Sequence, residues 1–285
     1  MDWLSNIVKS SIWGFILDFI KDIMDKAFNL IADLILQASD INKYFNASRY
    51  VVNVQAVAGA LLVLAVVWEA IKHQTGGVLP GEEKSLGKLA GQTVVGGVLI
   101  FFLPWSVTNI FLRLNNGVIQ MIKDIGVEVK MSVIVKALNL NSDPSSIGGL
   151  IIILTLVLSV GLIGLGISAG IRAVELIIII IISPIVAVSS VKSYDAIQIW
   201  VRETVAVVFT QSVQLLLLQI LMVVLINLNG VMMLIMAIGC VVLSLKGPQV
   251  LRQFLYSTGS GSAIVSSAGT VGRMAAMKVM FKSIK

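Results

Sequence analysis

Residues 148–191 read GGLIIILTLVLSVGLIGLGISAGIRAVELIIIIIISPIVAVSSV, and this stretch decides the class of fold. Only Arg172 and Glu175 are charged within it. About 20 apolar residues are enough for one helix to cross the hydrocarbon core of a bilayer. A run of this length without a polar stripe is typical of helices that contact lipid. The stretch therefore predicts two membrane crossings joined by a tight turn at Arg172 and Glu175.

The composition of the whole chain points the same way. Hydrophobic residues make up 57% of the 285 residues, charged residues make up 13%, and the mean hydropathy is +0.97. These values fit a polytopic membrane protein and fit a soluble domain poorly. We therefore expect an all-α fold, a polytopic transmembrane helical bundle.

The chain offers little for catalysis or metal binding. Cys240 is its only cysteine and His73 its only histidine. This leaves no disulfide framework, no CxxC pair and no zinc site built on paired histidines. A phosphate-binding loop of the form G-x-x-x-x-G-K-[ST] is also missing. We expect neither enzymatic activity nor a cofactor.

Three segments follow from the pattern of charge. Residues 1–45 place apolar side chains at helical spacing with lysines and aspartates between them, which predicts a long amphipathic helix too charged to cross a bilayer. That helix either rests on the membrane surface or packs against another subunit. Residues 46–246 form the predicted transmembrane domain, and residues 247–285 form a basic tail that contains a Ser/Gly-rich centre.

About six crossings are predicted in all. Besides the pair within residues 148–191, apolar runs predict crossings at residues 51–71, 89–112, 204–228 and 231–245. Between the second and third crossings, residues 113–140 have the pattern of an amphipathic interfacial helix. Lys246-Gly247-Pro248 is predicted to end the last crossing, because proline interrupts a helix.

The basic residues orient this arrangement. With six crossings, both ends lie on one side, together with all of the 21 lysines and arginines except Lys72, Lys84, Lys88 and Arg172. Cytoplasmic loops carry the excess of lysine and arginine. The sequence therefore predicts a cytoplasmic (inner) membrane protein with a cytoplasmic C-terminus. If residues 148–191 crossed only once, the N-terminus would move outside and the tail would stay inside.

Polar side chains within the crossings are the candidate functional residues. Arg172 and Glu175 either mark a hairpin tip among the lipid headgroups or form a buried pair that faces a channel or another subunit. Gln211, Gln214 and Gln219 share one side of the fifth crossing. They either hydrogen-bond to other helices, which is the common use of such residues, or line a wet lumen.

Two further groups are candidates for contact with neighbours. Gly161, Gly166 and Gly170 give the third crossing a small face on which another helix can pack closely. The basic residues of the C-terminal region are candidate contacts for anionic lipid or for DNA phosphates, and they include Arg252, Arg273, Lys278 and Lys282.

The layout resembles the TrbL-type inner-membrane subunits of conjugative type IV secretion systems. The resemblance is carried by the amphipathic N-terminal segment, the Gly- and Ile-rich region 161–184, and the stretch LKGPQVLRQFLYSTG at residues 245–259. It implies a channel or scaffold subunit, present in several copies, that helps single-stranded DNA with its bound relaxase to cross the membrane. The implied partners are membrane lipids, other secretion-system membrane subunits and an assembly ATPase.

Two other functions are compatible with the residues. A secondary transporter or small permease would use proline-broken helices and an intramembrane Arg/Glu pair, but we find no convincing inverted repeat. A non-conducting scaffold for membrane assembly would need only the packing faces.

Overall fold

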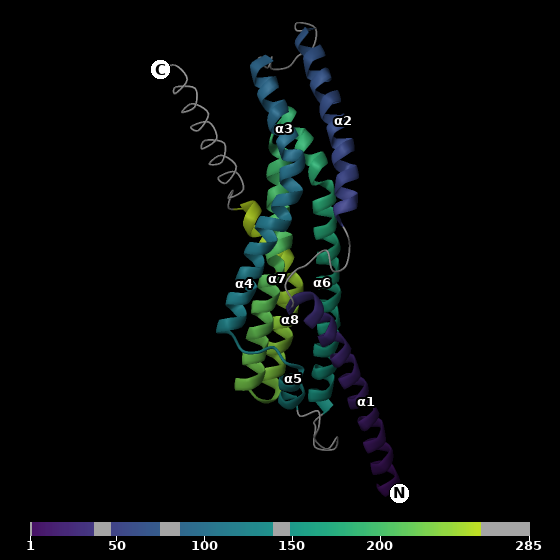
Figure 1. Ribbon diagram of the computed structural model, residues 1–285. Helices are drawn as coiled ribbons and strands as arrows, with labels where there is room; N and C mark the ends of the chain where they lie inside the picture. The colour runs from purple at the N-terminus through teal and green to yellow at the C-terminus, as the bar shows by residue number, and fades with distance from the viewer. Residues whose placement is uncertain (1, 37–46, 75–85, 139–148, 258–285) are drawn as a thin grey trace. The chain divides into compact units, whose positions relative to one another are not determined.

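The computed structural model describes residues 2–36, 47–74, 86–138 and 149–257, and within these ranges the chain is helical and contains no strand (Figure 1). The elements in order are α1 (Asp2–Ile31), the π-helix η1 (Ala32–Leu36), α2 (Ala47–Gln74), α3 (Leu86–Ser106), the π-helix η3 (Val107–Phe111), α4 (Leu112–Ile125), α5 (Met131–Ala137), α6 (Gly149–Val188), the 3₁₀-helix η5 (Ser189–Val191), α7 (Asp195–Asn227) and α8 (Gly230–Ser257). The predicted all-α fold is confirmed.

Five helical segments of the described chain are long and apolar enough to cross a membrane. They are Ala47–Gln74, Gly87–Ile125, Leu150–Val191, Asp195–Asn227 and Gly230–Gln253. The predicted crossings at residues 51–71, 89–112 and 231–245 each lie within one of them, and the crossing at residues 204–228 does so except for its last residue.

The predicted hairpin within residues 148–191 is wrong, because α6 is one continuous helix through Arg172 and Glu175. The sequence around these charges, Ile-Arg-Ala-Val-Glu-Leu, contains no residue that favours a turn, and the single Gly170 before it is tolerated in a helix. Arg172 also needs no headgroup, since it finds acceptors inside the protein.

Two other predicted boundaries differ from the structure. α8 continues through Pro248 to Ser257 instead of ending at Lys246. A proline removes one helical hydrogen bond but does not end a helix whose apolar spacing resumes, as it does here at the half-buried Leu251 and Leu255. The amphipathic segment 113–140 forms two helices, α4 and α5, with the break beginning at Gly126.

The chain forms two compact units. Unit 1 contains residues 1–40, 113–175 and 209–248, and unit 2 contains residues 41–112, 176–208 and 249–285. The three-part division predicted from charge stays a prediction, because these units reflect packing and not placement in a membrane.

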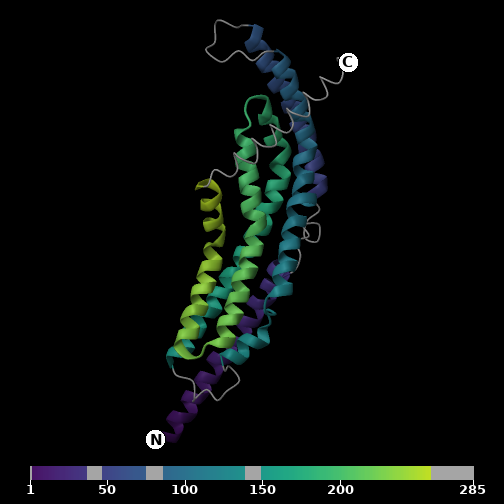
Figure 2. The ribbon, with the colours of Figure 1, turned by 90° about the vertical axis from the view of Figure 1, so that its left-hand side faces the viewer.

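The core of unit 1 is built on close helix packing. α1 and η1 contribute a buried ridge, Ile20, Met24, Ala27, Ile31 and Ile35, whose spacing of three and four residues places it on one face. The ridge packs in one cluster with buried leucines of α6 and α7. α7 and α8 lie side by side and are joined by a short turn (Figure 2), and Gly230 takes the positive φ of 67° that this turn requires.

Two of the three glycines predicted to allow close packing, Gly161 and Gly166, have close neighbours within unit 1. A Cβ on Gly161 would lie 2.8 Å from Val241 Cγ1 of α8, and one on Gly166 would lie 3.3 Å from Leu30 Cβ of α1. A Cβ on Gly170 would lie 4.0 Å from Leu34 Cδ1, which is an ordinary contact distance. The small face of α6 therefore receives α8 and the N-terminal helix of the same chain.

The core of unit 2 is smaller. α2 and α3 pack side by side, and their buried residues Val51, Ala58, Ile100 and Leu103 form a cluster with Trp200 and with residues of the second half of α6. The Trp200 indole N–H donates to the Ile179 carbonyl at 3.2 Å. Most of α2 remains exposed, as expected for a helix that contacts lipid.

Candidate functional site

Arg172 is a charged residue buried within unit 1. Its side chain lies on α6 with 6% of its surface exposed. One terminal guanidinium nitrogen donates to Gln211 Oε1 at 3.1 Å, and the other donates to the Leu34 carbonyl at 3.2 Å. Both acceptors are uncharged, so these bonds do not use Glu175, which is half-buried one turn further along α6. A buried cation held by neutral dipoles depends strongly on each of them.

Gln211 on α7 connects this cation to two other helices. Its Oε1 accepts from Arg172 and also from Asn115 Nδ2 of α4 at 3.1 Å, and its Nε2 donates to the Ile35 carbonyl at 3.1 Å. The Ser212 hydroxyl donates to Asn115 Oδ1 at 2.7 Å. Gln211 and Asn115 have no exposed surface. Four segments of unit 1, namely the α1–η1 end, α4, α6 and α7, therefore share one buried polar network.

The network closes the C-terminal end of α1–η1. The last carbonyls of a helix have no helical partner and carry the negative end of the helix dipole. Here three consecutive carbonyls accept from side chains: Leu34 from Arg172, Ile35 from Gln211, and Leu36 from the Lys123 ammonium of α4. Two of these donors are cations, which are the favoured partners at this end of a helix. The hydrogen bonds of this site thus hold the C-terminal end of the N-terminal helix against α4, α6 and α7.

The other glutamines of α7 also bond to neighbouring helices. Gln214 Nε2 donates to the Ser168 hydroxyl of α6 at 3.4 Å, and Gln219 Nε2 donates to the Ile122 carbonyl of α4 at 3.0 Å. Gly126 leaves the space that Gln219 occupies, because a Cβ there would lie 1.9 Å from Gln219 Oε1. All three glutamines are therefore buried and donate hydrogen bonds to other helices.

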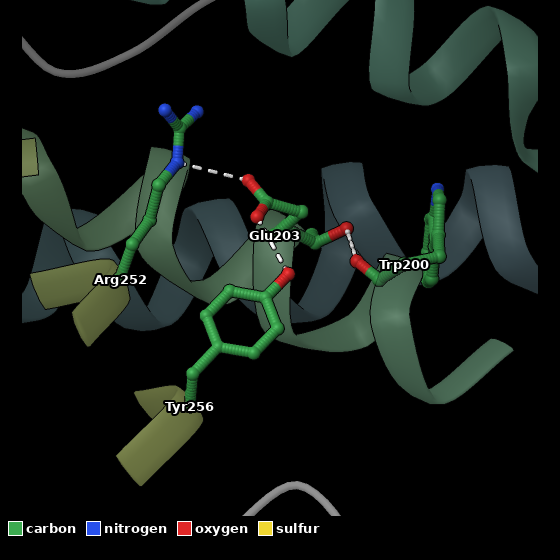
Figure 3. A network of polar contacts seen from close by, with 5 residues as sticks. Trp200, Glu203, Arg252 and Tyr256 are labelled. Atoms are coloured by element: carbon green, nitrogen blue, oxygen red, sulfur yellow. Dashed lines mark hydrogen bonds and ion pairs between the residues drawn. The ribbon is translucent and has the colours of Figure 1, made fainter. Parts of the chain in front are cut away.

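A second polar cluster lies in unit 2, where the start of α7 meets the end of α8 (Figure 3). Glu203 Oε2 accepts from Arg252 Nε at 2.9 Å, and Glu203 Oε1 accepts from the Tyr256 hydroxyl at 2.8 Å. The Arg202 guanidinium carbon lies 5.6 Å from the centre of the Tyr256 ring. Desolvation raises the pKa of Tyr256, the Glu203 hydrogen bond and charge raise it further, and the two arginines oppose the rise.

This cluster gives Arg252 a protein partner that sequence reasoning did not foresee. The ion pair is partly exposed, with 35% of the Arg252 side chain and 30% of the Glu203 side chain accessible. Arg273, Lys278 and Lys282, which were predicted to contact lipid or phosphate together with Arg252, lie outside the described residues.

Sequence reasoning missed several members of both clusters. Asn115 and Lys123 lie in a segment interpreted as interfacial, where polar residues were expected to face water. Ser212 follows Gln211 directly, but a hydroxyl in an apolar helix commonly bonds to its own backbone and gives no distinct signal. Backbone carbonyls, which provide three of the acceptors, have no signal in the side-chain pattern at all.

Comparison with known proteins identifies one family. The sequence profile of the family described as conjugal transfer protein TrbL matches residues 1–283. No curated protein and no solved structure matches the chain.

Proposed function

We propose a role for this chain from its family: it belongs to the TrbL family of conjugal transfer proteins and is a multi-pass membrane subunit of a conjugative type IV secretion system. The proposed role is to form part of the passage for single-stranded DNA and its bound relaxase. The observation that carries the proposal is the family match over residues 1–283 of a chain with five membrane-capable helices. The role is non-catalytic, and the energy comes from partner ATPases.

The passage lies between copies of the chain and not within one. Lining a wet lumen requires polar side chains that face water. Arg172, Gln211, Gln214 and Gln219 are instead buried and donate to groups of the same chain. This supports a homo-oligomer in which each copy contributes a rigid wall. Single cysteines at positions 211, 214 and 219, in a chain that lacks Cys240, should resist a water-soluble thiol reagent, and ready labelling would place the lumen inside the chain.

The tail lies on the cytoplasmic side of the cytoplasmic membrane. Residues 246–285 contain lysines and arginines and no aspartate or glutamate, which favours retention in the cytoplasm. With α6 as a single crossing, five crossings place the N-terminal helix on the opposite side. Of the other lysines and arginines outside the crossings, nine then lie on the side of the N-terminal helix and five on the side of the tail, so the orientation rests on the tail.

The test is removal of the gene from its mobile element, followed by measurement of conjugal transfer. We expect transfer to fall by several orders of magnitude, with recovery when the wild-type gene is supplied separately. The complemented strain should also yield an oligomer that copurifies with other secretion-system membrane subunits and an ATPase. Unchanged transfer would contradict the proposal. A monomer that moves a small solute into vesicles would favour a transporter, and an oligomer with normal assembly but no effect on DNA passage would favour a scaffold.

A further inference from the structure

Arg202 is a cation that the described part of the chain does not satisfy. It lies half-buried near the start of α7. Its Nε is buried without an acceptor, and within the described residues its guanidinium forms neither a hydrogen bond nor an ion pair. Its one described contact is with the face of the Tyr256 ring. A guanidinium has five N–H donors, so one held without acceptors calls for an anion from elsewhere.

The neighbouring carboxylate of Glu203 bonds to other groups, and within the described residues no bond joins it to Arg202. Each oxygen of Glu203 already accepts a bond, one from Arg252 and one from the Tyr256 hydroxyl. Arg202 and Arg252 both act on the charge environment of Tyr256, so both cations are near this ring. The described cluster contains two arginines, Arg202 and Arg252, and one carboxylate, Glu203, so it has an excess of positive charge. The Tyr256 hydroxyl donates to Glu203 (Figure 3), and the face of the Tyr256 ring contacts the Arg202 guanidinium.

The position of the cluster along the helices matches the depth of lipid headgroups. With a rise of about 1.5 Å per residue, Glu203 lies about 36 Å along α7 from Asn227, and Arg252 lies about 33 Å along α8 from Gly230. The hydrocarbon core of a bilayer is about 30 Å thick. If the turn between α7 and α8 lies at one membrane surface, the cluster lies just beyond the hydrocarbon at the other.

We propose that Arg202 binds the phosphate of an anionic phospholipid. The planar guanidinium fork matches two phosphate oxygens, and such paired bonds are stronger than bonds between neutral groups. Towards the hydrocarbon, Val250 of α8 is 52% exposed. Such an apolar surface suits acyl chains, which a nucleic acid or a free phosphate does not have. The site is independent of what the assembled machine transports.

The experiment uses the purified full-length chain in a neutral detergent. Phosphatidylglycerol is titrated in, and the readouts are the lipid retained in native mass spectrometry and the unfolding temperature. Arg202→Gln is compared with Arg113→Gln, because Arg113 is likewise an arginine on a helix but is exposed and has no described partner cluster. Phosphatidylcholine, inorganic phosphate and an oligodeoxythymidine are titrated in parallel. Arg202→Lys, which keeps the charge and loses the fork, provides a second variant if the glutamine variant does not fold.

The expected result is one retained phosphatidylglycerol per chain, with affinity about tenfold or more lower in Arg202→Gln, as loss of a charge-assisted hydrogen bond predicts. Arg113→Gln should bind like the wild type, and Arg202→Lys should be intermediate. Equal loss in Arg202→Gln and Arg113→Gln would overturn the proposal in favour of general surface attraction. The lipid assignment would be overturned if inorganic phosphate raised the unfolding temperature as much as phosphatidylglycerol does. It would also be overturned if the chain bound the oligonucleotide in preference to the lipid.

Discussion

Arg172 and Arg252 are each held by hydrogen bonds to other helices, but their surroundings differ in kind. Arg172 in unit 1 is buried, and its acceptors are an amide oxygen and a helix-end carbonyl. Arg252 in unit 2 is partly exposed, and its acceptor is a carboxylate. Water can replace the partner of Arg252 but cannot reach that of Arg172. The buried cation therefore makes four segments depend on one another, whereas the exposed pair mainly sets a local arrangement.

The energies follow from this difference. An ion pair with both partners about one-third exposed contributes about 0–1 kcal/mol, because solvent screens the charges. A buried polar group that loses its partner costs about 1–3 kcal/mol, and more if it is charged. Changes in the buried network should thus be felt throughout unit 1, and changes at Glu203 should be small. Four experiments, from the largest expected effect to the smallest, test this difference and the packing of unit 1 on which it depends.

Gln211→Leu should have the largest effect. It removes the acceptor shared by Arg172 and Asn115 and the donor to the Ile35 carbonyl, which leaves a buried cation short of a partner. We expect a loss of about 3–5 kcal/mol in the free energy of unfolding in mixed micelles. Ser212→Ala, which removes a single bond beside it, should cost about 1 kcal/mol. Similar losses for the two variants would show that Gln211 is not the centre of the network.

A disulfide should join the N-terminal helix to α6. In a chain with Cys240→Ala, Leu30→Cys and Gly166→Cys bring two Cβ atoms to about the separation of a disulfide, since a Cβ on Gly166 would lie 3.3 Å from Leu30 Cβ. Mild oxidation should form the bond and stabilise unit 1 by about 2–4 kcal/mol. The control pair, Leu30→Cys with Gly164→Cys, should not react, because Gly164 faces Leu245. Cross-linking of both pairs to the same extent would mean that α1 is not seated as described.

Gly161→Ala tests how tightly unit 1 is packed. The added methyl group meets Val241 Cγ1 at 2.8 Å and should cost about 1–3 kcal/mol. Gly164→Ala is the matched control, because its nearest neighbour lies at an ordinary 3.5 Å. Val241→Ala should recover part of the loss in the double variant. Equal unfolding free energies for the two glycine variants would contradict the close contact between α6 and α8.

Glu203→Gln should have the smallest effect on stability, about 0.5 kcal/mol. It should also lower the pKa of Tyr256 towards its ordinary value, because the Glu203 bond and charge contribute to raising it. A raised pKa means that the contribution of Tyr256 to stability is present below its ordinary pKa and is lost as the pH rises through the raised value. Phenolate absorbance, read as the difference between each protein and its Tyr256→Phe counterpart, measures the shift. An unchanged midpoint would exclude the Glu203 contact.

The sequence predicted the helical class, four of the five crossing-capable segments and the polar residues of α7, because apolar periodicity reports directly on which faces avoid water. It failed at Arg172 because a charge in an apolar run has two explanations, a turn at the surface or a buried partner. Its actual acceptors come from Leu34 and Gln211, far away in the sequence. Periodicity places a side chain on a face of a helix but does not name the atom opposite it.

The failure at Pro248 has a different cause. Proline forbids one backbone hydrogen bond, and the sequence does not reveal whether packing on either side compensates for it. The glycines of α6 show the same limit: the small face was predicted, but the sequence did not say that Leu30 and Val241 of the same chain would fill it. Such choices depend on tertiary contacts that form only once the helices have assembled.

The turn between α7 and α8 has a consequence for how the protein enters its membrane. Leu228, Asn229 and Gly230 carry no charge, and the positive φ of Gly230 lets the chain reverse within these few residues. Moving a charged residue into the middle of a bilayer costs about 2.5–3.5 kcal/mol by insertion scales, and this turn avoids that cost. The last two helices can therefore enter the bilayer together as a hairpin, without carrying a charge across it at their turn.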